Sequence, residues 1–484
     1  MNYLKKNLQV FLLAIILLAG VVIRLQNFYL PPIDAHPMRQ TDTECIAYNF
    51  AYTDGNILHP KACLIRPIIN KEGYFFLEFP LYQYILGMFY TIFGNGIVVA
   101  RLFNLALYLI ACTSLYIFVK KTIGERIAFI SLFLFSFAPG SIFFIGHAIH
   151  PDIFATTTLL ISLSLYAYYI DKKKRFLFIY SALFLSISVA TRPFGLLVLP
   201  GYLYLLWTHK SKVWEYLTLI AGSGLIFAFW KLWQLRFPHE YFAWENWVLL
   251  GKEQLLSFDI LVRRLIVRNV IGEVMGKIIS ILALFGTISV VFKRHNMILF
   301  SLLWLLGVPL YWFFVPNGNI VHQYYANVYI IPVVILASFG IDFIVSRLSH
   351  VYMRFSMLLL IFILVAYNGY RTSSYYFNDI DSSNYIMIAR EIEKYIPSDA
   401  KIIYPATLNS VPLSLAHRQG WVIGGSGIDV DPNADAILQM RQYGAEYVVL
   451  GYKNVDINPL EVAKIKKNSD LVVANKWVTI YKLH

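Results

Sequence analysis

The sequence predicts a polytopic α-helical membrane protein that carries a small α/β domain at its C-terminal end. Three observations support this prediction. First, 58% of the 484 residues are apolar and only 14% are charged, whereas about a quarter of the residues of a soluble globular protein are charged. Second, long apolar runs recur until about residue 370, and the mean hydropathy is +0.59. Third, the composition beyond residue 377 is that of an ordinary globular domain.

The first apolar run, in "MNYLKKNLQVFLLAIILLAGVVIRL", follows basic residues as in a signal peptide. It is longer than a typical signal-peptide core and lacks a small-x-small cleavage site, so we expect it to be retained as a first span. Further runs are long enough to cross roughly 30 Å of hydrocarbon. They cover residues 98–119, 128–145, 153–170, 176–190, 194–207, 214–230, 272–292, 297–315, 326–345 and 355–370. The sequence thus predicts about eleven transmembrane helices.

Basic residues mark every second connection between these runs. Clusters of Lys and Arg occur near residues 5–6, 120–126, 172–175, 210–212, 293–294 and 347–354, whereas "GHAIHP" and "PNGNIVHQYY" contain none. Because Lys and Arg are enriched on the cytoplasmic side, this pattern predicts a cytoplasmic N-terminus, with the C-terminal domain outside the cytoplasm. The net charge of +13 is then largely a signal of topology, and no nucleic-acid partner is expected.

Two long outer loops, residues 25–97 and 231–271, belong to a predicted transmembrane domain of residues 1–376. The predicted extracytoplasmic domain, residues 377–484, contains "SNYIMIAREIEKYI" as a helix, "AKIIYPA" as a strand, "DPNADAILQMRQYGAEYVVLGY" as a helix leading into a buried strand, and "DLVVANKWVTIYKL" as a closing hairpin. "GGSG" lacks the spacing of a phosphate-binding loop and is expected to be a turn. The sequence leaves open whether Cys45 and Cys63, in the same outer loop, form a disulfide.

Polar residues collect in the outer connections. Because an unpaired polar group is costly at membrane depth, such residues are expected to be functional. The first outer loop contains "HPMRQTDTECIAYNFA" and "FLEFPLYQY", and later connections contain "GHAIHPD", "TRPFG" and "VHQYY". The cytoplasmic turns offer only Lys and Arg. The sequence therefore predicts one outward-facing polar site assembled from loops that are distant along the chain.

The ordered set of motifs resembles the GT-C superfamily of polyprenyl-phosphate-dependent glycosyltransferases. The set consists of "MRQTDTECIAYNFA", "EFPLYQYILGMFYTIFG" with "ARLFNLAL", "HPDIFATTTLLISLSLY", "ATRPFGLLVLP" and "HQYYANVYIIPVVILASFG". It is similar to the group of protein O-mannosyltransferases and the lipid A aminoarabinose transferase, and more closely to bacterial members with W-R-Q-x-D-T in the first loop. Here Met38 replaces the Trp, and "EFPL" replaces a Lys-Pro-Pro-Leu motif, which removes a cation near the donor phosphate.

This resemblance implies an enzyme that moves a sugar from a polyprenyl-phosphate donor to a lipid, glycan or protein acceptor hydroxyl at the outer membrane face. The first-loop acid Asp42 is implied to be the general base, with inversion at the anomeric carbon, and Asp152 is a second catalytic candidate. The residues expected to bind the donor phosphate are Arg39, Arg192, His322, Tyr324 and Tyr325. Expected pocket residues are His36, Gln40, Glu78 and His150. No obligatory cofactor is expected, although binding of a divalent cation by the acidic residues stays open.

Each of these residues also has a purely structural interpretation. Asp42 is in a position to cap a helix that begins at about residue 43, and Asp152 to stabilise a helix start. Arg39 and Arg192, like Arg101, have the positions of interfacial anchors, and the His322 region that of an aromatic belt. Glu44 is expected on a solvated surface, because it faces away from Asp42 on a helix.

Two other functions remain open on sequence alone. A lipid or solute transporter would show inverted repeats, broken spans and ionisable groups at the membrane midplane, and the sequence shows no repeat and nearly charge-free spans. A non-catalytic relative that only binds a polyprenyl-phosphate sugar would have the same motifs as an enzyme.

Overall fold

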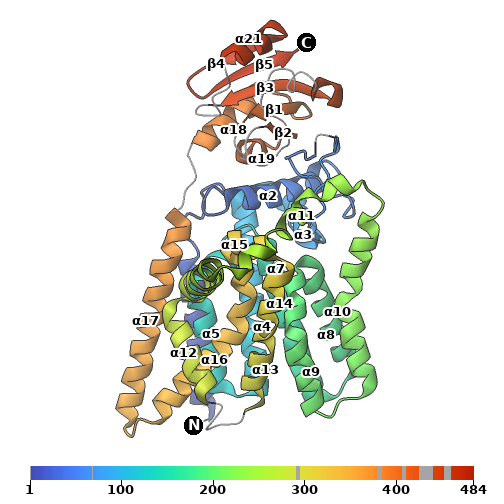
Figure 1. Ribbon diagram of the computed structural model, residues 1–484. Coiled ribbons are helices and arrows are strands. Elements are labelled where there is room, and N and C mark those ends of the chain that lie inside the picture. The colour runs from blue at the N-terminus through green and yellow to red at the C-terminus, as the bar shows by residue number, and fades with distance from the viewer. Residues whose placement is uncertain are drawn as a thin grey trace. The chain divides into compact units, whose positions relative to one another are not determined.

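The computed structural model describes residues 2–67, 69–289, 295–378, 384–405, 410–423, 440–451 and 459–484. These residues form two compact units. The first unit comprises Met1–Phe28, Arg101–Trp233 and Trp244–Phe377, and the second comprises Tyr29–Ala100, Gln234–Ala243 and Asn378–His484. The first long outer loop, which we assigned to the transmembrane domain, therefore folds with the C-terminal residues. Figure 1 shows the helices of the first unit and the sheet of the second.

The first unit consists of helices. Its longer helices are α1 (Asn2–Ile23), α4 (Ile97–Thr122), α5 (Glu125–Phe137), α7 (Pro151–Lys172), α8 (Arg175–Thr191), α9 (Leu199–Thr208), α10 (Val213–Gln234), α12 (Lys277–Ile288), α13 (Asn296–Leu305), α16 (Ile330–Ser346) and α17 (Val351–Asn378). Shorter helices are α6 (Pro139–Phe144), α11 (Ala243–Val248), α14 (Gly307–Phe314) and α15 (Pro316–Val321). Its non-α helices are η1 (Pro193–Val198), η3 (Lys252–Leu256), η4 (Asp259–Met275) and η6 (Gln323–Tyr329), whereas η2 (His239–Phe242) belongs to the second unit.

The predicted count of about eleven spans is not confirmed. Among the described residues, six helices are long and apolar enough to cross a membrane, or up to seven if the pair Asp259–Met275 and Lys277–Ile288, bent by 106°, counts as one span. Other predicted runs are shorter helices or are broken. The run at 128–145 divides into α5 and α6 at Pro139, because proline lacks the N–H that would continue the helix and is favoured at a first helical position. Hydropathy alone does not register such breaks.

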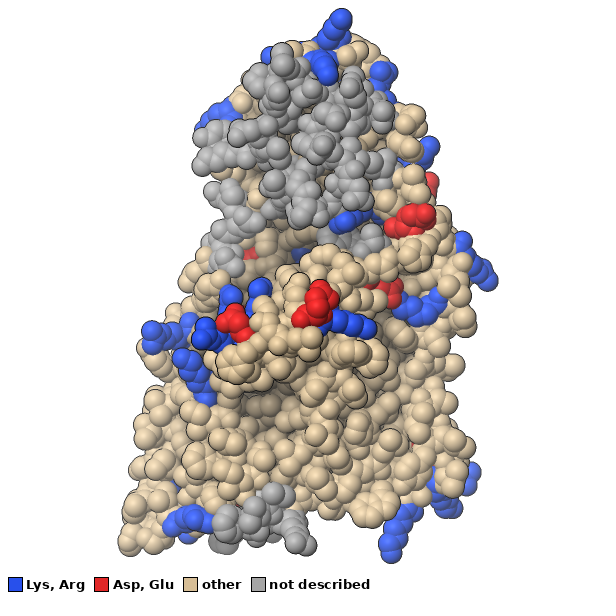
Figure 2. Space-filling model, viewed as in Figure 1, with Lys and Arg blue, Asp and Glu red and all other residues tan. Residues whose placement is uncertain are grey.

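The surface of the first unit is suited to a membrane. Figure 2 shows a broad face without charged side chains, with Lys and Arg gathered at its lower border. Large apolar side chains are exposed on several helices, among them Leu225 of α10, Leu310 of α14 and Ile363 of α17. Apolar exposure of this extent is typical of protein that contacts lipid. The chain is a multi-pass membrane protein.

Two glycines allow α12 and α16 to pack closely. A Cβ atom added at Gly286 would lie 1.8 Å from the carbonyl oxygen of Leu336, and one added at Gly340 would lie 2.0 Å from that of Leu282. No side chain fits at either position, so the two helix backbones are in direct contact. Small residues at helix crossings have this role in membrane proteins.

The second unit combines the first outer loop with a mixed sheet. Its helices are α2 (Pro37–Tyr52), α3 (Leu81–Phe93), α18 (Asn384–Tyr395), α19 (Val411–Leu415), η7 (Met440–Tyr443) and α21 (Pro459–Lys467). Its strands are β1 (Lys401–Pro405), β2 (Gly420–Ile423), β3 (Ala445–Gly451), β4 (Ser469–Ala474) and β5 (Val478–Leu483), in the order β2-β1-β3-β5-β4. β1 is parallel to β2 and β3, whereas β5 is antiparallel to β3 and β4. The predicted helix at 383–396, strand at 400–406 and closing hairpin are confirmed; "GGSG" and the predicted helix at 431–439 lie outside the described residues.

The first outer loop is built into the core of the second unit. Ile65 packs in one apolar cluster with Ile403 of β1 and Trp421 of β2. The backbone N–H of Gly420 donates to the carbonyl of Cys63 at 2.9 Å, and the N–H of Ile65 donates to the carbonyl of Gly420 at 2.8 Å. Cys63 forms a disulfide with Cys45 of α2, which settles the pairing that the sequence left open. The disulfide therefore connects α2 to the segment that borders β2.

Candidate functional site

Helix α2 carries the motif "MRQTDTEC" and begins before it. Pro37 is the first helical residue, and His36 precedes it with a positive φ of 59°. Asp42 therefore lies inside the helix, and its interpretation as an N-cap is wrong. A close contact with α3 fixes the position of α2, because a Cβ atom added at Gly87 of α3 would lie only 2.7 Å from the carbonyl oxygen of Ala47.

Asp42 is buried, with 3% of its surface exposed. The hydroxyls of Ser410 and Ser414 donate to its Oδ1 atom, at 3.1 and 3.2 Å respectively. Burial raises the pKa of Asp42 from 3.8 to about 6, although the positive charge of Arg39 and the two serine hydrogen bonds partly oppose the rise. A carboxylate with such a pKa is ionised at neutral pH and still basic enough to accept a proton.

Arg39 lies one turn before Asp42 and forms an ion pair with Glu78. Glu78 also accepts a hydrogen bond of 2.8 Å from Gln83 of α3. The Nε and Nη1 atoms of Arg39 are buried, and no described residue accepts a hydrogen bond from them. Buried donors without a partner are uncommon in proteins, and a guanidinium binds phosphate oxygens through such N–H groups. Glu78 thus orients Arg39, whose remaining N–H groups are suited to an anionic ligand.

Gln40 and His36 lie near the N-terminal end of α2. The amide of Gln40 donates to Asp34 Oδ1 at 2.6 Å and to the carbonyl oxygen of Ala35 at 2.9 Å. Gln40 is completely buried, and these bonds hold the loop before the helix. His36 is half-buried at the helix start. For Gln40, this geometry indicates a structural role, and its contact with a ligand stays a prediction.

Glu44 is buried, contrary to the expectation of a solvated surface. Its Oε2 atom lies 3.0 Å from Nε2 of His417, and the ring of His417 stacks on that of Tyr48 with 3.9 Å between centroids. Burial alone would lower the pKa of His417, but the Glu44 carboxylate more than offsets this effect and raises the pKa above its usual value. The reason for the wrong expectation is that residues 410–418 cover this face of α2, which the local sequence does not reveal.

A second cluster of predicted residues lies in the first unit, at the start of α7. Nε and Nη2 of Arg192 donate to Oδ2 of Asp152 at 3.0 and 2.7 Å, and His150 also pairs with this carboxylate. All three side chains are buried. The Oδ1 atom of Asp152 is buried and has no hydrogen-bond partner among the described residues. Full burial excludes the role of an exposed interfacial anchor for Arg192.

Aromatic residues from η6 complete this second cluster. The ring of Tyr324 packs edge-on against His150 with 4.3 Å between centroids, and the guanidinium of Arg192 lies 5.9 Å from the ring centre of Tyr325. His322 stacks on Tyr324 at 5.0 Å. Because Tyr324 is only 4% exposed, it is part of the interior and does not belong to an aromatic belt. The structure thus brings together His150, Asp152, Arg192, His322, Tyr324 and Tyr325.

Arg101 has a structural role that differs from the expected anchor. It is fully buried, donates to the carbonyl of Asn27 at 2.7 Å and lies 2.5 Å from Nε2 of His147. Among the described residues, no group of three or more His, Cys, Asp or Glu side chains is arranged to hold a metal ion.

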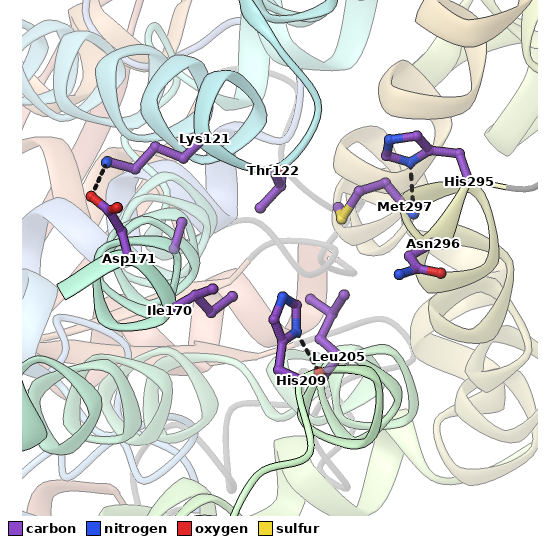
Figure 3. A pocket seen from close by; sticks show the side chains of 10 residues that line it. Lys121, Thr122, Ile170, Asp171, Leu205, His209, His295, Asn296 and Met297 are labelled. Atoms are coloured by element: carbon purple, nitrogen blue, oxygen red, sulfur yellow. Dashed lines mark hydrogen bonds and ion pairs between the residues drawn. The ribbon is translucent and has the colours of Figure 1, made fainter. Parts of the chain in front are cut away.

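A cavity of about 720 Å³ lies elsewhere in the first unit (Figure 3). It is lined by the ends of α4, α7 and α9 and the start of α13. Lys121 pairs with Asp171 at 3.0 Å on one wall, and His209 donates to the carbonyl of Leu205 on another. No residue that the sequence analysis assigned to catalysis or donor binding lines this cavity. Its walls come from connections that the charge pattern predicts to be cytoplasmic.

The sequence analysis did not identify Ser410, Ser414 and His417. The two serines are four residues apart in "SVPLSLAH", a spacing that places them on one helix face. That spacing alone is common in proteins and gave no reason to connect them with Asp42.

Comparisons with known proteins agree with this description. The family described as "Dolichyl-phosphate-mannose-protein mannosyltransferase" matches residues 78–233. The structure of ArnT from Cupriavidus metallidurans bound to undecaprenyl phosphate superposes with a TM-score of 0.69 at 12% identity, covering 97% of this chain and 97% of that chain.

Archaeal structures show the same fold. The Archaeoglobus fulgidus oligosaccharyltransferase tethered with an acceptor peptide gives a TM-score of 0.60 at 13% identity, covering 93% of this chain and 70% of that chain. AglB from the same organism, in complex with an inhibitory peptide and a dolichol-phosphate, gives 0.56 at 12% identity, covering 92% and 70%. A comparison with the sequences of curated proteins gives no match. The family match over residues 78–233 and the shared fold support the resemblance that the motifs indicated: the chain has the fold of ArnT and of the archaeal oligosaccharyltransferase.

Proposed function

We propose that this protein is a glycosyltransferase that moves a sugar from a polyprenyl-phosphate donor to an acceptor hydroxyl, with Asp42 as general base. The observation that carries this proposal is the environment of Asp42. Its carboxylate is buried on a rigid helix, has a pKa of about 6, and receives both serine hydrogen bonds on Oδ1. Both described hydrogen bonds to this carboxylate are on Oδ1, and Oδ2 is therefore our candidate for the oxygen that accepts the substrate proton.

The proposed reaction is a direct displacement. Asp42 takes the proton of the acceptor hydroxyl, the acceptor oxygen forms a bond to the anomeric carbon, and the bond from that carbon to the phosphate oxygen breaks with inversion. The polyprenyl phosphate leaves with the electron pair of the broken bond. Groups with positive charge stabilise this departing anion. Arg39 and Arg192, with His322, are our candidates for that task, because guanidinium groups bind phosphate oxygens in a fixed geometry.

The proposed orientation places Asp42 and the sheet outside the cytoplasm. Besides the distribution of Lys and Arg, the disulfide between Cys45 and Cys63 supports it, since disulfides persist in oxidising compartments. A reporter enzyme that is active only outside the cytoplasm, fused after His484, should be active. A reporter active only in the cytoplasm should be silent at the same position, and the reverse result would overturn the orientation.

The proposed donor follows from this orientation. No nucleotide sugars are available outside the cytoplasm, so the sugar must arrive on a lipid carrier. Purified protein should transfer radiolabelled sugar from a polyprenyl-phosphate sugar and none from the matching nucleotide sugar. Transfer from the nucleotide sugar alone would refute the proposal. We also expect the rate to be insensitive to EDTA, because arginine can neutralise the leaving phosphate; an EDTA-sensitive rate would assign part of that task to a divalent cation.

The acid limb of the pH profile is expected near pH 6. Asp42 must be ionised to accept a proton, and its pKa in the folded protein is about 6. Below that pH the protonated fraction grows, so kcat/KM should fall about tenfold per pH unit and should be constant above about pH 7. The measurement is kcat/KM for the lipid-linked donor between pH 4.5 and 8.5. A limb near pH 4 would indicate a solvated carboxylate and would contradict this assignment.

The transporter alternative has one observation in its favour, the bent pair of η4 and α12. Broken spans occur in transporters, where they surround a midplane site. In this chain η4 has an exposed ion pair between Arg263 and Asp259, and its exposed Arg268 pairs with the partly buried Glu273. This pattern is typical of an amphipathic segment at the membrane surface. The same sugar-transfer assay separates the alternatives, because neither a transporter nor a non-catalytic binding protein would form product.

A further inference from the structure

The segment 410–418 packs on α2 through three kinds of contact. Its serines bond to Asp42, its histidine pairs with Glu44 and stacks on Tyr48, and Figure 1 shows its helix α19 beside α2. Ser410 and Ser414 are both fully buried. Both hydroxyls donate to the same oxygen of Asp42. They therefore restrict the rotation of the carboxylate and also stabilise its negative charge.

We infer that Ser410 and Ser414 are positioning residues for the base, so that the C-terminal domain completes the active site built on α2. The two donors hold Oδ1 and thereby restrict the rotation of the carboxylate. They also favour the ionised form of the carboxylate, because a hydrogen bond to a charged group is stronger than one to its neutral form. This inference rests on the proposed function of Asp42.

Charges around Asp42 act in the same direction as the serines. On α2, Arg39 lowers the pKa of Asp42 by its positive charge. From the segment that packs against this part of α2, two neutral hydroxyls contact Asp42: that of Ser414 on α19 and that of Ser410, which directly precedes α19. His417 of the same segment pairs with Glu44. The described residues thus offer Asp42 one cation and two neutral donors, and removal of the donors should raise its pKa further.

The test is the pH profile of the double variant Ser410→Ala/Ser414→Ala in the full-length protein. We expect the acid limb of kcat/KM to move from about pH 6 to about pH 7, a displacement typical of the loss of hydrogen bonds to a charged group. The rate should fall about fivefold or more at pH 6 and little at pH 8, since the base is ionised again there. Each single variant keeps one donor and should show a smaller displacement.

A matched control is Ser469→Ala. Ser469 is a buried serine of the same domain whose hydroxyl donates to the carbonyl of Ile465 within its own segment. Its loss should leave the acid limb at about pH 6. If the wild type transfers sugar and the double variant keeps the wild-type limb, the inference is overturned and the proposed function stands. If the wild type itself transfers no sugar, the proposed function fails first and the inference falls with it.

If the double variant is too inactive for a pH profile, the dependence of its thermal stability on pH tests the inference instead. A carboxyl whose pKa is higher in the folded state loses stability as pH rises from its unfolded pKa to its folded pKa. Relative to Asp42→Asn, which does not titrate, the wild type should lose thermal stability between about pH 4 and pH 6. In the double variant this loss should continue to about pH 7. If the double variant loses stability over the same pH range as the wild type, the inference is overturned.

Discussion

Replacement of Asp42 by asparagine should lower the rate of sugar transfer by about 100-fold or more, the usual effect of losing a general base. The amide has the size of the carboxylate and still accepts hydrogen bonds from Ser410 and Ser414 through its oxygen, so the protein should fold normally. Because burial disfavours the charged form, the variant should be at least as stable as the wild type at neutral pH. The measurements are kcat with the lipid-linked donor and thermal unfolding in the same detergent.

The matched control for this prediction is Asp470→Asn. Asp470 is in the same unit but its side chain is 77% exposed, so its loss should leave the transfer rate unchanged. A well-folded Asp42→Asn protein with wild-type kcat would remove Asp42 from the mechanism. The base would then be sought at Asp152, whose Oδ1 atom is buried without a described partner.

Arg192→Ala should have the second large effect. It removes a guanidinium that donates twice to the buried Asp152 and leaves that carboxylate without its principal counter-charge. Breaking a buried ion pair from one side typically costs about 3 to 5 kcal/mol. Transfer should fall by at least about 100-fold, because both the phosphate site and the local structure are lost. Thermal unfolding and transfer assays measure the two losses separately.

Two further variants separate the structural role of Arg192 from its role in phosphate binding. Arg192→Lys keeps the charge but loses the planar fork, so it should fold and show a raised KM for the donor. Arg192→Gln/Asp152→Asn replaces the ion pair with a neutral pair of similar size, which should restore stability without restoring transfer. A double variant that is both stable and active would show that neither side chain takes part in the reaction.

Features that depend on neighbouring residues could be predicted from the sequence, whereas features that depend on distant residues could not. Apolar runs and the alternation of basic residues are local signals, and they indicated a membrane protein with a small α/β domain. The breaks at Pro139 and between η4 and α12 depend on how a helix packs after it bends, and hydropathy does not reveal them. In the second cluster, Asp152 and Arg192 were named as candidates because each lies in a short polar connection between apolar runs, in "GHAIHPD" and "TRPFG" respectively.

The surroundings of Asp42 could be predicted from the sequence only in part. The motif around Asp42 identified the residue, but Glu44 was misjudged and Ser410, Ser414 and His417 were not recognised. Their contacts with α2 join positions more than 360 residues apart, and both serines lie in a short apolar stretch that resembles ordinary core. Such a contact becomes visible only when the tertiary structure brings the two segments together.

This separation has a consequence for how the protein is made. Asp42 is synthesised near the beginning of the chain, and its serine partners follow 368 and 372 residues later. At typical rates of translation this delay is roughly 20 to 75 s, during which the nascent chain is already being inserted into the membrane. In the orientation proposed above, the carboxylate meets its hydroxyl donors only after the segment that contains Ser410 and Ser414 has been translocated and folded. A product that ends before residue 410 would lack both hydroxyls beside Asp42, so assembly of the proposed catalytic site depends on synthesis of the C-terminal segment.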